Sequence, residues 1–210
     1  RSNSASGNVQ VEDVNLELYS NTGSGNYSFE NFQGSMQLNT GSGNIMIIES
    51  QANANCNTGS GNIKIAGSDG KLGLNTGSGR ISLDGAAGSI NANTGSGQVT
   101  GKNVTVTGHS SFNAGSGNVS LSLAAQPSAD LSVNAGSGNS SLDMNGFKFK
   151  GELVMQCGQK GGNISAPFSF DTKEVIPQGR NGTIRKTKRF GNAGTTIQVS
   201  TGSGTAKVSK

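Results

Sequence analysis

Residues 36–65 read MQLNTGSGNIMIIESQANANCNTGSGNIKI and contain the pattern that decides the fold. The tripeptide Gly-Ser-Gly occurs twice in this stretch, with a spacing of 18 residues. Over the whole chain it occurs eight times, and its second Gly stands at positions 25, 43, 61, 79, 97, 117, 138 and 204. Decayed copies at 5–7 and 161–164 bring the total to about ten units. Self-similarity at a nearly fixed spacing is typical of repeat proteins.

Apolar and polar residues alternate on both sides of the tripeptide. Ile45 and Ile47 follow Gly43 at two and four residues, and Met36 and Leu38 precede it at seven and five. The same positions are apolar in most other units. A period of two residues is typical of a strand with one buried face, and no segment has the helical period of 3.6. Each unit therefore reads as strand, turn, strand, second turn.

One unit buries too little apolar surface to offset the entropy of ordering its backbone, so the units must stack. We predict an all-β, single-domain β-solenoid over residues 1–210, with about ten rungs of about 18 residues each. Residues 1–138 are expected to form regular rungs and residues 139–210 irregular ones. An insertion at about 167–193 interrupts the period, and we expect it to cap the C-terminal end, because an open end exposes a strand edge.

The turn residues support stacking. Glycine is expected to supply positive φ, and the absence of a side chain, where the chain bends tightly in every rung. Asparagines precede and follow the turns in two columns, and stacked amides can hydrogen-bond along such a column. We interpret both columns as structural, with a ligand-binding array as the alternative. The members are Asn21, Asn39, Asn57, Asn75, Asn93, Asn113 and Asn134 in one column, and Asn8, Asn26, Asn44, Asn62, Asn118, Asn139 and Asn163 in the other.

Composition excludes several classes of protein. No apolar run approaches the length of a membrane-spanning helix, and Gly lacks the every-third spacing of collagen. The net charge of +4 is small and scattered, which argues against nucleic acid as a partner. The two cysteines, Cys56 and Cys157, are expected in one inward column about five rungs apart, buried and unpaired.

The repeated Asn-Thr-Gly-Ser-Gly-Asn-Ile units, and the C-terminal run Thr201-Gly202-Ser203-Gly204-Thr205-Ala206-Lys207-Val208, resemble a bacterial family of repetitive β-solenoid domains. That family carries the label adhesin although its function is unknown. The resemblance implies a β-helical fold and an extracytoplasmic location, in the periplasm or at the cell surface. It supplies no catalytic residues.

Two features could carry catalysis. Glu12 and Glu30 occupy equivalent positions in adjacent units, and paired carboxylates hydrolyse glycosidic bonds. The same column continues with two apolar residues, Ile48 and Ala66, and then with one charge of each sign, which favours solvated surface side chains. The single histidine, His109, precedes two serines but lies in an expected turn. We therefore predict no catalytic residue, no cofactor and no metal site.

The one marked charge cluster lies in the insertion and comprises Lys173, Arg180, Arg185, Lys186, Lys188 and Arg189. Such a cluster can bind an anionic polysaccharide, glycolipid or protein. It can also belong to the cap alone, and both roles are compatible.

The sequence as a whole indicates a non-catalytic structural or adhesin-like module at the cell surface or in the periplasm, which binds glycan or an envelope protein. A carbohydrate-active enzyme on a β-helix is the first alternative, and an envelope-stress or regulatory scaffold is the second. We expect no transmembrane segment and a leader that has been removed before Arg1.

Overall fold

The computed structural model describes residues 1–177, 182–192 and 194–210. In this part of the chain every regular element is a strand, and no helix that could cross a membrane is present. The strands are β1 (Ser2–Ser4), β2 (Val9–Thr22), β3 (Tyr27–Thr40), β4 (Ile45–Ile48), β5 (Gln51–Thr58), β6 (Ile63–Ala66), β7 (Asp69–Thr76), β8 (Ile81–Asp84), β9 (Ala87–Thr94), β10 (Val99–Val106), β11 (Ser110–Ala114), β12 (Val119–Leu123), β13 (Leu131–Ala135), β14 (Ser140–Asp143), β15 (Gly151–Gly158), β16 (Asn163–Ser165), β17 (Thr172–Ile176), β18 (Thr183–Phe190), β19 (Thr196–Thr201) and β20 (Thr205–Ser209).

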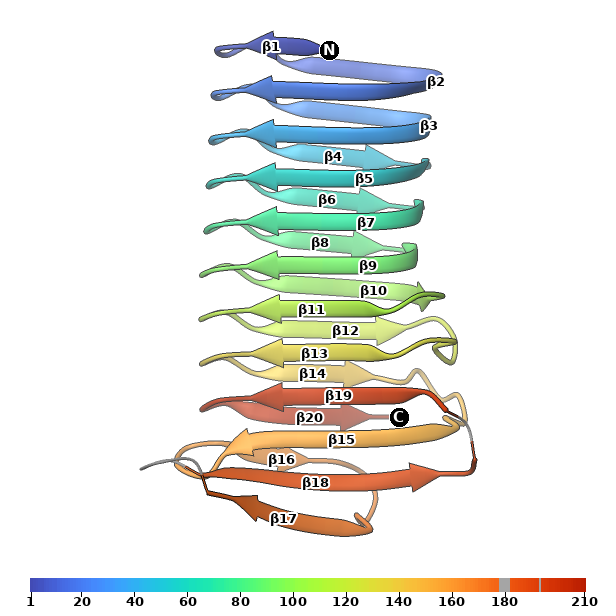
Figure 1. Ribbon diagram of the computed structural model, residues 1–210, viewed down its shortest axis with the longest axis vertical. Coiled ribbons are helices and arrows are strands. Elements are labelled where there is room, and N and C mark those ends of the chain that lie inside the picture. Colours follow the sequence, from blue (N-terminus) through green and yellow to red (C-terminus); the bar gives the residue numbers. More distant parts are fainter. Residues whose placement is uncertain (178–181, 193) are drawn as a thin grey trace.

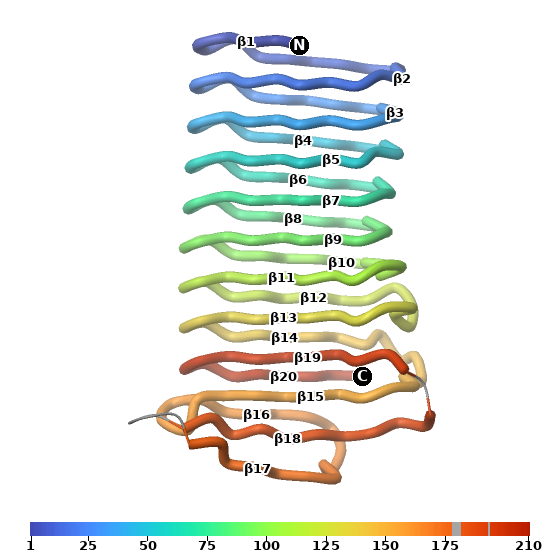
Figure 2. Tube along the Cα trace, in the orientation of Figure 1, coloured from blue at the N-terminus to red at the C-terminus, as the bar shows by residue number. Residues whose placement is uncertain are grey.

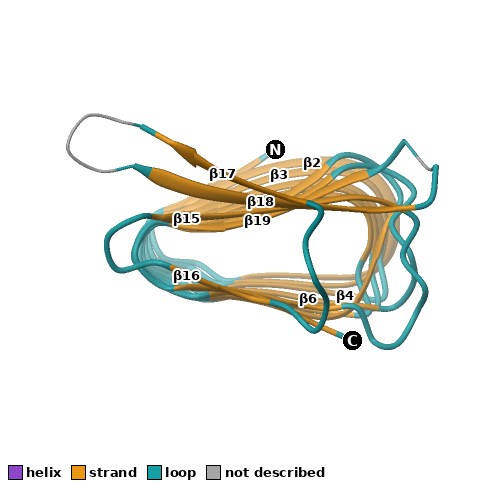
Figure 3. Cartoon of the chain, turned by 90° about the horizontal axis from the view of Figure 1, so that it is seen from below, coloured by secondary structure: helices purple, strands orange, loops and turns teal. Residues whose placement is uncertain are grey.

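The strands coil into a rod with two long faces, so the predicted β-solenoid is confirmed (Figure 1). One face contains the C-terminal half of β2 and of β3, followed by β5, β7, β9, β11 and β13. The other contains their N-terminal halves, followed by β4, β6, β8, the first residues of β10, β12 and β14, and the last residues of β10 pair with β9. Neighbouring strands are parallel, and the register in the regular part advances by one unit, as in Tyr27–Ile45–Ile63. The end-on view shows the two faces as the flattened sides of one coil (Figure 3).

The predicted alternation of apolar and polar residues determines which side chains form the core. Ile63, Ile65, Leu72 and Leu74 are at most 1% exposed and stack on equivalent residues above and below. The intervening Lys64 points outward. Because every rung repeats these positions, the core is one continuous column of aliphatic side chains between the faces.

The reason for glycine in the Gly-Ser-Gly turns differs in part from the expectation, because the expected positive φ is wrong. Positive φ is found at other glycines of the described chain but not at these. Successive turns instead lie so close that a Cβ on Gly41 would stand 2.6 Å from the carbonyl oxygen of Gly23, and a Cβ on Gly61 would overlap the carbonyl oxygen of Gly43. The absence of a side chain therefore serves the contact between rungs, and not the bend within one.

Positive φ occurs at the other end of the rung, in a column of residues that was not predicted. Six successive units have a residue of positive φ at the same position there, and in three of them a glycine three residues further on (Gly34, Gly70 and Gly88) also has positive φ. The column comprises Asp13 (φ 52°), Asn31 (φ 49°), Glu49 (φ 47°), Gly67 (φ 56°), Gly85 (φ 64°) and Asn103 (φ 51°). Asp, Asn and Gly are the residues that tolerate this conformation best, and their spacing of 18 was the available signal.

The expected count of ten rungs was slightly too high, because the coil makes about eight turns. After β14 the chain skips the position of the next rung, and β15 and β16 form the layer beyond it. The chain then forms the hairpin β17–β18 and runs back to the skipped position, which β19 and β20 occupy. Strand β19 pairs with β13 on one side and β15 on the other, and β20 lies between β14 and β16. We call β19–β20 the inserted rung; the C-terminus ends within the stack and not at its tip (Figure 2).

The insertion changes the position of the second cysteine. Cys157 pairs with Thr201, which pairs with Ala135, whereas Cys56 lies in the column of Leu38 and Leu74. The two cysteines are therefore in different columns, contrary to the expectation. The turn after β15 is two residues longer than the turn after β19, which shifts the register of this decayed unit. Both thiols are buried and free, as predicted.

Burial makes Cys56 chemically inert in the folded protein. It raises the pKa of the thiol to about 12, so the thiolate is scarce at pH 8. In a Cys157→Ser variant, we expect Ellman's reagent to label Cys56 only at the rate of global unfolding, and to label it completely in denaturant. Labelling of the native variant within minutes would contradict the assigned position of Cys56.

The C-terminal end is covered by the hairpin β17–β18 and by the loop that connects β16 to β17. Phe168 packs edge-on against Phe170 and Phe190, with ring centroids 5.7 and 5.2 Å apart, and Phe149 packs against Phe190 at 5.8 Å. Phe149 belongs to the core, and the other three rings pack against it. The end-on view shows the connecting loop crossing this end of the coil (Figure 3). The predicted cap at this end is confirmed.

Candidate binding groove and basic cap

A groove runs along one edge of the rod, beside the Gly-Ser-Gly turns. It has a volume of about 1090 Å³ and is lined by 18 residues, three from each of six rungs. Each rung contributes one Asn or equivalent, one Thr and one Gly in the regular part, as in Asn57, Thr58 and Gly59. At the glycine, the groove is lined by backbone without a side chain.

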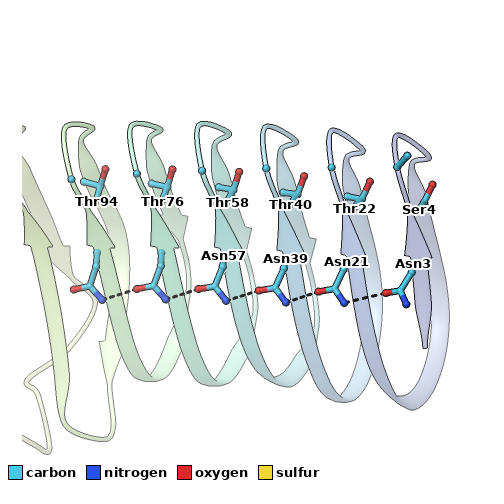
Figure 4. Close-up of a pocket in the computed structure, with 18 residues that line it drawn as sticks. Asn3, Ser4, Asn21, Thr22, Asn39, Thr40, Asn57, Thr58, Thr76 and Thr94 are labelled. Carbon is cyan, nitrogen blue, oxygen red and sulfur yellow. Dashed lines mark hydrogen bonds between the residues drawn. The ribbon is translucent and has the colours of Figure 1, made fainter.

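The first asparagine column forms one wall of the groove as a continuous amide ladder (Figure 4). The Nδ2 group of Asn39 donates to Asn21 Oδ1 at 2.8 Å, and that of Asn57 donates to Asn39 Oδ1 at 2.9 Å. The ladder continues to Asn134 and includes Asn3, which the sequence analysis did not assign. Each ladder bond uses one of two N–H donors and one of two acceptor sites of an amide. Donors and acceptors thus remain available to a ligand along the wall.

The threonines lie beneath the groove, and their hydroxyls form hydrogen bonds with the backbone of the turns. The hydroxyl of Thr58 donates to the carbonyl oxygen of Gly43 at 2.9 Å and accepts the N–H of Gly61 at 3.0 Å. Thr58 is 5% exposed. A ligand in the groove would therefore contact the asparagine amides and the glycine backbone, and not the threonine hydroxyls.

The second asparagine column lies on the other side of the turns, outside the groove. Its side chains bond to backbone: Asn44 Oδ1 accepts the backbone N–H of Asn62 at 2.9 Å, and Asn26 Oδ1 accepts that of Asn44 at 2.8 Å. Where the inserted rung intervenes, Asn139 Oδ1 accepts the N–H of Thr205 and not of Asn163. This column locks one turn to the next, as the structural interpretation predicts.

The basic cluster is divided between the two faces of the hairpin. In an antiparallel pair, directly opposite residues share a face. Lys186 and Lys188 lie opposite Met155 and Leu153, which are buried, so they point to the core side of the cap. Lys173 lies opposite Lys186 on the same side. The alternate residues Arg185 and Arg189 point to the other side, and Arg180 lies outside the described residues.

Three of these cations hold the cap in place. The ammonium of Lys186 lies 5.2 Å from the ring centroid of Phe170. Lys188 Nζ pairs with Asp171 Oδ1 at 2.6 Å, and the Arg189 guanidinium lies 3.8 Å from Glu152. The backbone N–H of Arg189, and then Lys188, lower the pKa of the Asp171 carboxyl, which is ionised at neutral pH. The cluster therefore fastens the loop before β17 to β18, and its role toward an external anion stays a prediction.

A family model described as Toastrack DUF4097 matches residues 13–174, more than half of the chain. The chain belongs to the Toastrack family. No curated protein and no solved structure matches it. Toastrack domains have no assigned function, and the adhesin label expected from the resemblance stays a prediction. The matched part of this Toastrack domain includes most of the groove and ends within β17, before the inserted rung.

The catalytic candidates are placed as follows in this Toastrack chain. Glu12 and Glu30 are paired neighbours in register, as expected from their spacing. His109 Nδ1 lies 3.8 Å from Asp130, and the two side chains are 85% and 51% exposed. A histidine in a catalytic triad is oriented by a buried carboxylate, which this exposed pair does not provide. Within the described residues, no group of three or more His, Cys, Asp or Glu side chains could hold a metal ion.

Proposed function

We propose that this Toastrack domain is a non-catalytic extracytoplasmic module whose groove binds a linear glycan. The observation that carries the proposal is the groove itself, with an unbroken amide ladder along its wall. Amides offer both donors and acceptors, which complements sugar hydroxyls. The lining contains only Asn, Ser, Ala, Thr and Gly, so a neutral ligand fits better than a charged one.

The backbone of the groove argues against a polypeptide ligand that adds as a strand. Such binding needs unpaired N–H and C=O groups at a sheet edge. Here those groups are used in the ladders between rungs, as in Thr40–Thr58–Thr76. Six rungs at the usual strand spacing of about 4.8 Å extend over roughly 24 Å, which suits a short oligosaccharide in extended form.

The test uses a matched pair of variants from one turn. Asn39→Ala interrupts the ladder inside the groove, whereas Asn44→Ala interrupts the second column outside it. After a glycan-array screen identifies a binder, Asn39→Ala should weaken its affinity about tenfold, the effect of losing one to two hydrogen bonds. Asn44→Ala should leave the affinity unchanged. Calorimetric titration with the purified oligosaccharide measures both.

Three results would contradict this proposal. One is the absence of any glycan ligand on the array, and another is an equal loss of affinity in the two variants. The third is repeated cleavage of a polysaccharide by the wild-type protein, which would favour a carbohydrate-active enzyme. Binding confined to envelope proteins would instead support the scaffold alternative.

A further inference from the structure

Positive charge is concentrated at one place on the regular part of the rod. Residues 2–147 contain only four Lys or Arg residues, namely Lys64, Lys71, Arg80 and Lys102. Lys64, Arg80 and Lys102 line a hollow of about 310 Å³ on the face that contains β6 and β8, and we call it the basic hollow. Lys71 lies in β7, on the opposite face. Three of the four cations are therefore neighbours in space, although about two repeat units separate the first from the last in the sequence.

The parallel register explains how these three side chains meet. Lys64, Ser82 and Thr100 are paired in register on β6, β8 and β10. Arg80 precedes Ser82 by two residues, and Lys102 follows Thr100 by two. Paired residues are about 4.8 Å apart, and alternate residues of one strand are about 6.6 Å apart, so long side chains at these positions reach the same point. The three cations thus surround two short hydroxyl side chains.

The basic hollow coincides with an interruption of the second asparagine column. Asn62 and Asn118 belong to that column, and the two units between them have Arg80 and Gln98 at the same position. Both of these longer side chains line the hollow. The backbone contact of the column is nevertheless kept, because the N–H of Arg80 donates to Asn62 Oδ1 at 2.8 Å. The fold itself therefore does not require Arg at this position, which points to a role outside the stacking of rungs.

The protein leaves the charge of the basic hollow largely uncompensated. Among the described residues, Lys64, Arg80 and Lys102 form no ion pair, and all three are exposed. The lining contains one carboxylate, Asp84, which is paired in register with Lys102. Three cations and one carboxylate give the lining a net charge of +2. The hollow is thus suited to an anion, in contrast to the neutral groove.

We propose that the basic hollow binds a phosphate group, either as the free ion or as a monoester of a sugar. A phosphate monoester carries a charge of about −1.5 to −2 at pH 7 and has three acceptor oxygens, which match the charge and the donors of the lining. The guanidinium of Arg80 can donate two parallel hydrogen bonds to these oxygens, and Lys64 and Lys102 act as point charges.

The remaining lining residues suit a sugar beside the phosphate. The Asp84 carboxylate can accept a hydrogen bond from a sugar hydroxyl, and the Gln98 amide can donate or accept one. A volume of about 310 Å³ lies at the lower end of the range for small-molecule sites. The site lies on the opposite face from the strands that carry the amide ladder of the groove, so it does not depend on the glycan proposed there.

Titration of the ¹⁵N-labelled protein, followed by NMR, tests the site with three probes: inorganic phosphate, glucose 6-phosphate and glucose. Sodium chloride keeps the ionic strength constant, so that screening is equal in all titrations. We expect saturable shifts of the amides in residues 80–84 and 98–102 with both phosphate compounds, and none with glucose. A higher affinity for glucose 6-phosphate would support the sugar ester as the ligand, and equal affinities would support free phosphate.

Two variants that each remove one positive charge from the middle of the rod form a matched pair. Arg80→Asn restores the asparagine of the column, so we expect the fold to be retained, and circular dichroism checks this. It should weaken the affinity for phosphate about tenfold, the effect of losing hydrogen bonds from a charged donor. Lys71→Gln, on the opposite face, should leave the affinity unchanged.

Three results would overturn the proposal. One is the absence of saturable shifts at residues 80–84 and 98–102 with either phosphate compound at millimolar concentration. Another is an equal loss of affinity in Arg80→Asn and Lys71→Gln, which would show attraction by net charge alone. The third is a set of shifts confined to β17 and β18, which would place the phosphate at the basic cap.

Discussion

Substitution of Gly61 by alanine is expected to destabilise the solenoid by about 3 kcal/mol, the upper part of the range for overpacking. The added Cβ would overlap the carbonyl oxygen of Gly43 in the adjacent turn and crowd the hydroxyl oxygen of Thr58. Neither turn can move away alone, because each is stacked on both sides. Urea denaturation, monitored by circular dichroism, measures the change in free energy of unfolding.

Gly73 provides the matched control for this substitution. It lies within β7 in the next unit, and a Cβ there would stand 3.5 Å from the side-chain oxygen of Asn55, an ordinary contact. Gly73→Ala should leave the stability unchanged or raise it by up to about 1 kcal/mol, since alanine reduces the entropy of the unfolded chain. Equal effects of Gly61→Ala and Gly73→Ala would contradict the explanation that turn glycines serve rung-to-rung contact.

Deletion of residues 195–210 is expected to unfold the C-terminal part of the rod while the N-terminal rungs stay folded. The deletion removes the inserted rung and with it Ile197, Val199, Ala206 and Val208, which are at most 2% exposed. It also removes the ladders that join β13 to β15 and β14 to β16. In a solenoid each rung is stabilised by its neighbours, so the layers beyond the gap lose their support.

Hydrogen exchange gives the measurement for this deletion. Amide protection in β15 and β18 should fall by about 100-fold or more, which corresponds to about 3 kcal/mol, whereas β5 and β7 should keep theirs. A synthetic peptide of residues 195–210 added in trans should restore protection, and the same peptide with Val199→Lys should not. Unchanged protection in the truncated chain would show that β15 packs directly on β13 in the absence of the inserted rung.

Much of this fold could be predicted from the local pattern. The 18-residue spacing and the alternation around Gly43 and Gly61 predicted parallel stacked strands, because side chains one unit apart must share a face. The ladder of asparagines followed from the same spacing. These predictions succeeded because each depends on one unit and its copy next along the chain.

The candidate sites could not be predicted from repeat spacing and alternation. The groove lies where the amide ladder and the Gly-Ser-Gly turns of six rungs meet, and the depth of a surface is not encoded in residue spacing. The basic cluster appeared as one patch in the sequence, yet the pairing of β18 with β15 sends Lys188 and Arg189 to opposite sides. The alternation of a strand divides consecutive charges between two faces, and only the pairing partner shows which face is the core.

The amino-acid sequence alone determined the repeating unit, its two strands and its inward side chains, because these follow from side-chain alternation and from the regular spacing of the turns. The order of the units at the C-terminal end was decided only in the tertiary structure. There, Gly202 stacks on Gly136, although 65 residues lie between them in the chain. Gly158 in turn stacks on Gly202. The edges of similar rungs offer nearly the same ladder of hydrogen bonds, so the neighbour of each rung depends on core packing and on the path of the connecting hairpin, and not on adjacency in the chain.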